Sequence, residues 1–187
     1  MSLDWTTFTD GELAILSMAG RDAAFAEIMS RHRQAIFRLI RASVGGSDDA
    51  LDLVQETFIS AHQAMKRFDS ERSMRAWLST IAINKCRDWG RKRIVRRFLF
   101  SASTISVAAE RVVDDQAGQA AVAEDREQLD RVAQAIAKLP TNLREPLVLR
   151  TIEGLSQADT AAILSISEKA VETRLARARA KLQLAIS

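Results

Sequence analysis

Helix-breaking residues are scarce along this chain. Only 2 of its 187 residues are proline and 7 are glycine, whereas alanine, leucine, arginine and glutamate recur throughout. These four residue types favour helices, and glycine and proline disfavour them most. Tyrosine is absent, and no segment alternates apolar and polar residues in the manner of a half-buried strand. The sequence therefore predicts an all-α protein.

The bulk composition predicts a soluble, globular chain. Hydrophobic residues make up 47% and charged residues 27%, which is ordinary for globular domains. No apolar run approaches the roughly 20 residues that span a membrane. The first ten residues lack the basic start and apolar core of a secretory signal. We therefore expect a cytoplasmic protein with no membrane insertion.

Catalytic and metal-binding patterns are missing from the sequence. Cys86 is the single cysteine and there are two histidines, so neither an internal disulfide nor a metal cluster of familiar spacing is expected. We find no glycine-rich phosphate loop and no nucleophile–base pair. The sequence predicts no enzymatic activity, no cofactor and no small-molecule substrate.

Apolar residues recur at helical spacing over four segments of the first half, at about 9–19, 22–44, 47–65 and from 73 or 74 onward. Thr9 and Glu12 have the spacing of a capping box, and Asp22 is expected to cap the second helix. Gly45 should end that helix. Gly90 is expected to interrupt the fourth helix, at a cost of about 1 kcal/mol relative to alanine.

The second half begins with a segment that lacks an apolar stripe. Residues 98–125 carry a net charge of −4 and are predicted to form a linker. A helix from Leu129 to Pro140 and another over 142–152 should follow, with Pro146 near the first turn of the latter, where proline is tolerated.

Residues 156–182 have the spacing of a helix-turn-helix motif. Ser156 and Ser167 are expected to cap its two helices, Ala161 is small enough for their crossing, and Ser165 marks the turn. The second helix should present donors and acceptors suited to base edges in a major groove. These residues are Ser167, Glu168, Lys169, Glu172, Thr173, Arg174 and Arg177. The alternative is an ordinary helical hairpin with a solvated charged face.

Charge is distributed unevenly along the chain. Residues 85–97 hold seven basic side chains against the single Asp88, a net charge of +6, whereas residues 126–187 carry +3. Basic side chains bind phosphates, so the pattern suggests two nucleic-acid surfaces joined by an acidic linker. A solvated helix end remains the alternative for the basic block.

The third predicted helix has an acidic face opposite its apolar stripe. This face carries Asp48, Asp49, Asp52, Gln55 and Glu56. It is either solvated or a surface that docks another protein.

Four segments together resemble the extracytoplasmic-function (ECF) sigma factors, small bacterial transcription initiation factors of the sigma-70 class. Residues 49–58 (DALDLVQETF) resemble the family's docking segment for core RNA polymerase, with Leu51 where glutamate is usual. Residues 77–84 (WLSTIAIN), followed by Asp88 and Arg91, resemble the helix that recognises and melts the −10 element. Residues 139–153 resemble the approach to the helix-turn-helix, and 171–179 resemble the −35 recognition helix.

The resemblance implies two small helical domains, 1–97 and 126–187, joined by a flexible linker, 98–125. It implies that the chain binds core polymerase and promoter DNA and is controlled by an anti-sigma factor in a stress response. The implied −10 residues are Phe68, Arg72, Ser73, Asn84, Lys85, Arg87, Arg91 and Lys92. The implied core-docking residues are Asp49, Asp52, Leu53, Gln55 and Glu56.

The alternative functions are a DNA-binding regulator of another kind, a protein-interaction adaptor and an enzyme. A one-component regulator with a C-terminal helix-turn-helix would be a dimer with a helical sensor domain and a ligand pocket. A protein-interaction adaptor would use neither basic surface for DNA. An enzyme is disfavoured because the sequence contains no catalytic constellation.

Overall fold

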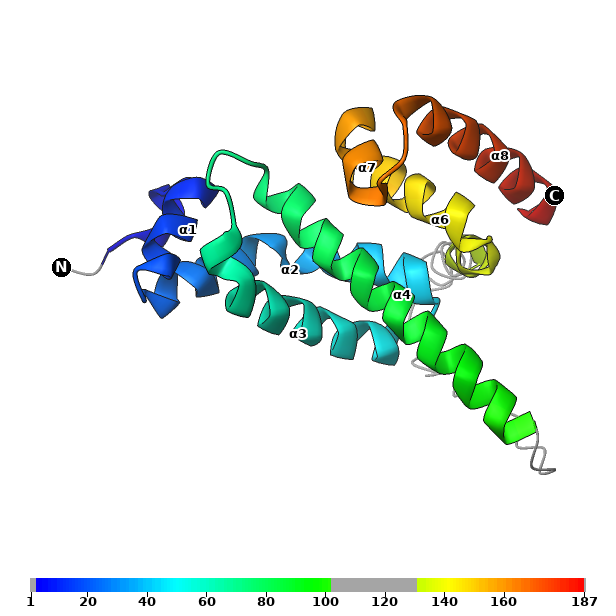
Figure 1. Cartoon of the computed structure of the whole chain (residues 1–187), viewed down its shortest axis with the longest axis horizontal. Helices are drawn as coiled ribbons and strands as arrows, with labels where there is room; N and C mark the ends of the chain where they lie inside the picture. Colours follow the sequence, from blue (N-terminus) through cyan, green and yellow to red (C-terminus); the bar gives the residue numbers. More distant parts are fainter. Residues whose placement is uncertain (1–2, 102–130, 187) are drawn as a thin grey trace, which may run out of the picture.

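The computed structural model describes residues 3–101 and 131–186. Every regular element in these two ranges is helical, and the helices form two groups, as expected for an all-α chain. We call residues 3–101 the N-terminal bundle and residues 131–186 the C-terminal bundle. In Figure 1 the C-terminal bundle lies against α2 and α4 of the N-terminal bundle. None of the described helices is long and apolar enough to cross a membrane.

The N-terminal bundle contains four α-helices and two short 3₁₀ turns. Its elements are η1 (Trp5–Thr7), α1 (Asp10–Met18), α2 (Asp22–Val44), α3 (Ser47–Ala64), η2 (Met65–Arg67) and α4 (Met74–Ser101). Leu13, Ile28, Ile36, Leu39 and Leu78 are fully buried in its core. Burial of each such side chain contributes about 1.5–3 kcal/mol, which is the main force that holds the four helices together.

The helix ends test the sequence-based boundaries. Thr9 and Glu12 form the predicted capping box, and Gly45 ends α2 in the left-handed conformation at φ 80°. Asp22 is not the cap of α2 as predicted: Arg21 holds that position, and Asp22 is already helical. A carboxylate in the first turn still interacts favourably with the helix dipole, which explains why the sequence signal looked like a cap. Gly90 does not interrupt α4, which continues to Ser101.

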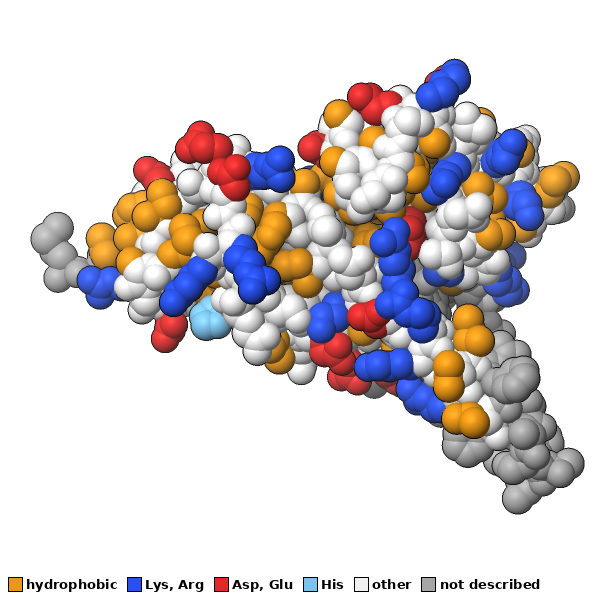
Figure 2. All heavy atoms as spheres, in the orientation of Figure 1, with side chains coloured by type: hydrophobic (Ala, Val, Ile, Leu, Met, Phe, Trp, Pro, Cys, Tyr) orange, Lys and Arg blue, Asp and Glu red, His pale blue; other side chains and the backbone are white. Residues whose placement is uncertain are grey.

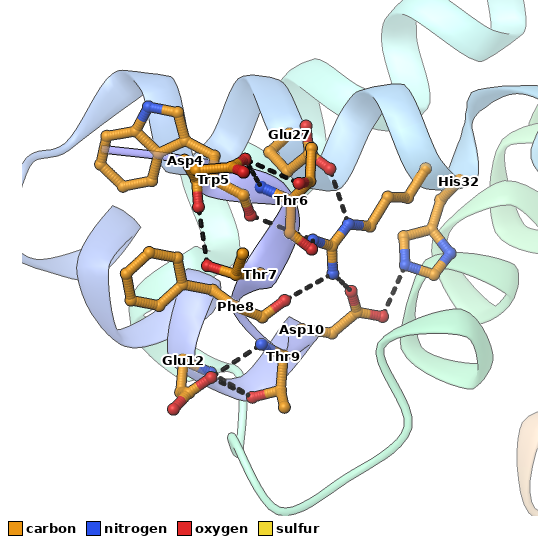
Figure 3. Close-up of polar contacts among 11 residues, drawn as sticks. Asp4, Trp5, Thr6, Thr7, Phe8, Thr9, Asp10, Glu12, Glu27 and His32 are labelled. Carbon is orange, nitrogen blue, oxygen red and sulfur yellow. Dashed lines mark hydrogen bonds and ion pairs between the residues drawn. The ribbon is translucent and has the colours of Figure 1, made fainter. Parts of the chain in front are cut away.

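Arg31 of α2 holds the residues that precede and begin α1; its partners Trp5, Thr6, Phe8 and Asp10 are labelled in Figure 3. Its guanidinium donates to the carbonyl oxygens of Trp5, Thr6 and Phe8 at 3.1, 3.0 and 2.8 Å. It also pairs with the carboxylate of Asp10 at 3.1 Å. One planar donor group therefore satisfies several backbone acceptors in and directly after the 3₁₀ turn η1.

The C-terminal bundle begins with a helix whose described part covers residues 131–138. It continues with α6 (Thr141–Leu147), the π-helical turn η3 (Val148–Ile152), α7 (Gln157–Leu164) and α8 (Glu168–Ile186). The single helix predicted over 142–152 is therefore divided. Pro146 lies near the end of α6 rather than in its first turn. Because proline has no N–H, it leaves a gap in the hydrogen-bond ladder just before the wider turn begins.

The helix-turn-helix is formed by α7 and α8. Ser156 accepts a hydrogen bond from the backbone of Asp159, and Ser167 accepts one from Ala170, so both act as caps. Ser165 turns the chain in the left-handed conformation at φ 54°. The crossing is sealed by apolar side chains that are nearly or fully buried. They are Ala161, Leu164, Val171, Leu175 and Ala178.

The two bundles touch along α2 and α4. η3 packs on α2, and α7 packs on α4. At the end of α2 the approach is very close, because a Cβ placed on Gly45 would come within 2.8 Å of the Cβ of Ala137. Glycine at this position thus serves both the helix end and the fit between the bundles.

Candidate nucleic-acid and protein interfaces

The predicted −10 residues of α4 divide into exposed and engaged side chains. Asn84, Arg91 and Lys92 are exposed, whereas Lys85 and Arg87 are half-buried. Arg91 pairs with Asp88 on the same helix, and Lys85 lies 3.6 Å from the carboxylate of Glu56 on α3. The exposed members are the ones that a phosphate could reach directly, with Arg91 exchanging its surface partner Asp88 for the phosphate.

The turn before α4 holds the other predicted −10 residues. Phe68 is 6% exposed, and its ring packs against Trp77 with centroids 4.9 Å apart. Ser73 accepts a hydrogen bond from the backbone of Ala76 at 3.2 Å and so caps α4. The Arg72 side chain is 81% exposed. Phe68 and Ser73 therefore shape the turn, and Arg72 is the member that can contact a ligand directly.

A cavity of about 550 Å³ lies over this turn. One wall is formed by the turn and the start of α4, including Arg72, Ser73 and Trp77. The opposite wall comes from α7 and includes Asp159, Ala162 and Ile163. The predicted −10 turn therefore faces the C-terminal bundle in this arrangement.

Two ion pairs cross between the bundles. Arg87 donates to both carboxylate oxygens of Glu145 on α6, each at 2.7 Å, and Glu145 is 7% exposed. Arg75 of α4 donates to the fully buried carboxylate of Glu153 at 3.3 Å. Sequence reasoning missed both pairs, because the partners are 58 and 78 positions apart and no local pattern links them.

The acidic face of α3 is exposed as predicted at four of its core-docking residues. Asp49, Asp52, Gln55 and Glu56 are exposed, but Leu53 is 5% exposed and belongs to the core. The indole of Trp89 donates to Asp49 at 3.2 Å. In Figure 2 acidic side chains gather at the start of α3, next to basic side chains along α4.

An apolar groove of about 560 Å³ lies between α2 and α3 and borders the acidic face. Leu51 and Gln55 line the groove and also belong to the segment predicted to dock on polymerase. Met29, Leu51 and Ile59 are 39%, 45% and 58% exposed. Exposed apolar side chains gathered in a groove are typical of a protein-binding surface.

The predicted recognition helix α8 lies on the side of the C-terminal bundle away from α4 (Figure 1). Six of its seven predicted contact residues are exposed, and Arg174 is half-buried. Lys169 and Glu172 pair at 2.8 Å, and the Thr173 hydroxyl donates to the backbone of Lys169. Both interactions lie on the surface, where such pairs are weak and readily exchanged for other partners.

Cys86 lies where the two bundles meet. It lines a cavity with Arg87, Gly90 and Ile94 of α4 and with Arg144 and Glu145 of α6. Burial raises the pKa of its thiol to about 12. The thiol is therefore protonated and unreactive near neutral pH while the bundles remain together.

Among the described residues, no group of three or more histidine, cysteine, aspartate or glutamate side chains could hold a metal ion. The exposed chemistry of these residues thus consists of basic, acidic and apolar surfaces.

Comparison with known proteins gives matches along most of the chain. The family models for Sigma-70 region 2 and Sigma-70 region 4 match residues 28–96 and 129–182. RNA polymerase sigma factor CnrH of Cupriavidus metallidurans is 42% identical over 92% of both chains. ECF RNA polymerase sigma factor SigM of Mycobacterium tuberculosis is 32% identical, covering 93% of this chain and 83% of that protein.

Solved structures give the same result. The structure of CnrH in complex with the cytosolic domain of CnrY matches with a TM-score of 0.70 and 36% identity, covering 94% of this chain and 95% of that one. The sigma factor RpoE of Bartonella quintana, in complex with the anti-sigma factor NepR, matches with a TM-score of 0.68 and 25% identity, covering 86% and 95%.

The chain belongs to the ECF sigma factors of the sigma-70 class. It is a transcription initiation factor that directs core RNA polymerase to promoters. The two-bundle arrangement and the order of the matched regions agree with the resemblance found in the sequence.

Proposed function

We propose that the three exposed surfaces divide the work of promoter recognition. The acidic face of α3 docks on core polymerase. α4 and the turn before it recognise and melt the −10 element, and α8 recognises the −35 element. The N-terminal and C-terminal bundles act as separate domains, 1–97 and 126–187, on the linker 98–125. The first four residues of that linker, 98–101, continue α4 in the structure, and residues 102–125 lie outside the described residues.

The observation that carries this proposal is the different chemistry of the two DNA-facing helices. α8 exposes a mixture of donors and acceptors, including Lys169, Glu172 and Thr173, and mixed chemistry suits base edges. The exposed end of α4 offers mostly positive charge, from Arg91 to Arg96, which suits phosphates and carries little sequence information. Asn84 is the exception on α4, because its uncharged amide can both donate to and accept from a base.

Core docking is supported by the charge of α3. Asp52 and Glu56 lie one helical turn apart on an exposed face. Such a face fits a basic surface on the polymerase and helps to steer the encounter. Leu53 acts from beneath, by holding the helix in place.

Control by an anti-sigma factor is the second part of the proposal. RpoE was solved with the anti-sigma factor NepR, and CnrH with the cytosolic domain of CnrY. In this chain the apolar groove between α2 and α3 leaves Leu51 and Ile59 exposed, and a partner would cover them. The chain would then act in the cytoplasm in a stress response, without catalysis of its own.

The test is reconstituted transcription. Purified chain, added to core polymerase lacking other sigma factors, should start transcription from promoters of the source genome. Permanganate footprinting should detect melting at the −10 element. Asn84→Ala should reduce melting more than it reduces binding to the closed promoter. Tight, sequence-specific binding of duplex DNA by the free chain as a dimer would instead identify a one-component regulator.

Free chain should bind duplex promoter DNA weakly. Two small bundles on a long linker must be ordered together on the DNA, and this ordering opposes binding until polymerase holds them. The affinity for the same promoter DNA should be measured with and without core polymerase. Tight binding only with polymerase indicates an ordering cost in the free chain, whereas weak binding in both cases indicates a general lack of DNA affinity.

A further inference from the structure

Gly11 of α1 lies against the backbone of the turn before α4. A Cβ placed on Gly11 would come within 2.7 Å of the carbonyl oxygen of Ser70, so close that one of the two backbones would have to shift. Gly11 is helical and its φ is not positive, so its conformation would accept alanine, which favours helices by about 1 kcal/mol over glycine. Close contact with the turn, and not backbone conformation, is therefore what requires glycine here.

The first turn of α1 is anchored to α2 by two neighbouring side chains (Figure 3). The carboxylate of Asp10 accepts from Arg31 at 3.1 Å and pairs with Nε2 of His32 at 2.7 Å. Arg31 also holds the three carbonyl oxygens that precede α1. The side chains of Arg31 and His32 are 27% and 13% exposed, so water screens these contacts less than it screens surface pairs. This end of α1 therefore resists movement away from the turn.

In the turn itself, residues 68–73, the hydrogen bonds are local and exposed. The backbone N–H of Glu71 donates to the carboxylate of Asp69 at 3.1 Å, and that of Arg72 donates to the Asp69 carbonyl oxygen at 2.9 Å. Asp69, Glu71 and Arg72 are all exposed. Exposed local contacts open at little cost. The turn is thus the softer of the two surfaces that meet at Gly11, and it would yield first.

We propose that Gly11 is a positioning residue for −10 recognition. It allows the backbone of α1 to support Ser70, while Arg31 anchors α1, and together they fix where the turn presents Arg72 to the melted strand. Neither Gly11 nor Arg31 touches DNA, and both act through the turn. Gly11 precedes residue 28, where the match to Sigma-70 region 2 begins. This inference rests on the proposed role of the turn.

The key variant is Gly11→Ala, which adds one methyl group at the contact. Because α1 is anchored, the turn should be displaced, and the rate of −10 melting by the holoenzyme should fall by roughly tenfold. Affinity for core polymerase and binding to the closed promoter should be unchanged. Permanganate footprinting and binding assays measure the three quantities. Gly90→Ala makes the same chemical change where nothing lies within 4 Å, and it should leave melting unchanged.

Arg31→Lys supplies a second variant that distinguishes positioning from general stability. Lysine keeps the charge but lacks the planar fork, so it cannot hold the carboxylate and the three carbonyl oxygens together. In Gly11→Ala combined with Arg31→Lys, the loosened α1 can move to make room for the methyl group. Melting should therefore recover severalfold relative to Gly11→Ala alone. If both residues merely stabilised the fold, their effects would add.

Arg72→Ala tests the turn directly under the same conditions and should slow melting. If Arg72→Ala slows melting but folded Gly11→Ala does not, the turn has its proposed role and Gly11 does not position it. If neither variant slows melting, the proposed role of the turn is wrong, and so is the inference. A double variant that melts DNA no better than Gly11→Ala alone also overturns the inference. Circular dichroism and thermal unfolding verify that each variant is folded.

Discussion

The two DNA-facing helices differ in how accessible they are. α8 exposes six of its seven predicted contact residues and faces away from the rest of the molecule. α4 is exposed from Arg91 to Arg96, but its middle is engaged by Glu145 and its first turn by Glu153 of the other bundle. The number of basic residues on a helix therefore does not by itself predict whether the helix is accessible to DNA. What matters is whether a carboxylate of the same chain already holds the arginines.

The two bundles also differ in the size of their cores. The N-terminal bundle has many large side chains that are fully buried. The C-terminal bundle has few, among them Val148, Leu149 and Val171. A small domain buries a smaller fraction of its surface and has little stability to spare. The C-terminal bundle should therefore be the more easily unfolded of the two.

Matched core truncations should have the largest effect and test this difference. Leu175→Ala in α8 and Leu39→Ala in α2 each remove a buried leucine and should cost about 3–4 kcal/mol. We expect Leu175→Ala to unfold the C-terminal bundle alone, and Leu39→Ala to leave the N-terminal bundle folded. Hydrogen exchange resolved by region measures both.

The control for these truncations is Leu184→Ala, because Leu184 is 83% exposed and its loss should change little. If Leu175→Ala reduces protection from hydrogen exchange equally in both bundles, the two bundles unfold as one unit.

Charge reversal on α3 should have the next largest effect. Asp52→Lys combined with Glu56→Lys places two positive charges on the face proposed to meet a basic partner. The affinity for core polymerase should fall by about 2 kcal/mol, roughly 30-fold. Fluorescence anisotropy with labelled core measures the change, and Asp22→Lys at the other end of the bundle is the control. Unaltered affinity in the double variant would remove α3 from the docking surface.

Substitutions on the two DNA-facing helices should separate sequence preference from general affinity. Arg174→Ala in α8 should change the preference among upstream promoter sequences by about 1–3 kcal/mol. Arg91→Gln with Lys92→Gln in α4 should weaken binding to many promoters alike. It should also reduce the slope of log affinity against log salt concentration by about 1 per lost phosphate contact. Holoenzyme binding to a promoter library at several salt concentrations measures both. The opposite pattern would reverse the assignment of the two helices.

The smallest effect concerns pH and the buried carboxylate of Glu153. Burial raises its pKa above the ordinary 4.5, although the charges of Arg75, Arg38 and His32 oppose this. The folded chain therefore binds this proton more tightly than the unfolded chain. Its contribution to stability is present at low pH and is lost as the pH rises through the raised pKa.

Glu153→Gln removes this titration. Relative to the unmodified chain, the variant should gain stability as the pH rises from about 4.5 toward neutrality. Urea unfolding at several pH values measures the difference, with the exposed substitution Glu168→Gln as the control. A stability difference that stays constant with pH would show that Glu153 does not titrate differently in the folded chain.

Local features of the fold could be predicted from the sequence. The capping box at Thr9, the left-handed end at Gly45 and the caps Ser156 and Ser167 all depend on residues within one helical turn. The predictions that failed also concern local choices between near-equivalent positions. Asp22 follows the cap rather than forming it, and Pro146 lies late in α6.

The candidate site could be predicted only in part. Residue type and spacing located the acidic and basic surfaces, but they could not reveal that Leu53 and Phe68 face inward. They also could not reveal the pair between Arg87 and Glu145, because it depends on how two separately folded bundles meet. Interactions of this kind are absent from any sequence window and require the tertiary arrangement.

The turn at Ser165 affects the stability of the helix-turn-helix without belonging to the side chains proposed to choose the promoter. A side chain held at φ 54° strains the backbone by about 1–2 kcal/mol relative to glycine. Ser165 lies between α7 and α8, outside the set of side chains proposed to contact bases. Variation there can adjust the temperature range over which the motif works while its promoter choice is kept. Heat tolerance and regulon membership can thus evolve on different residues of one small motif.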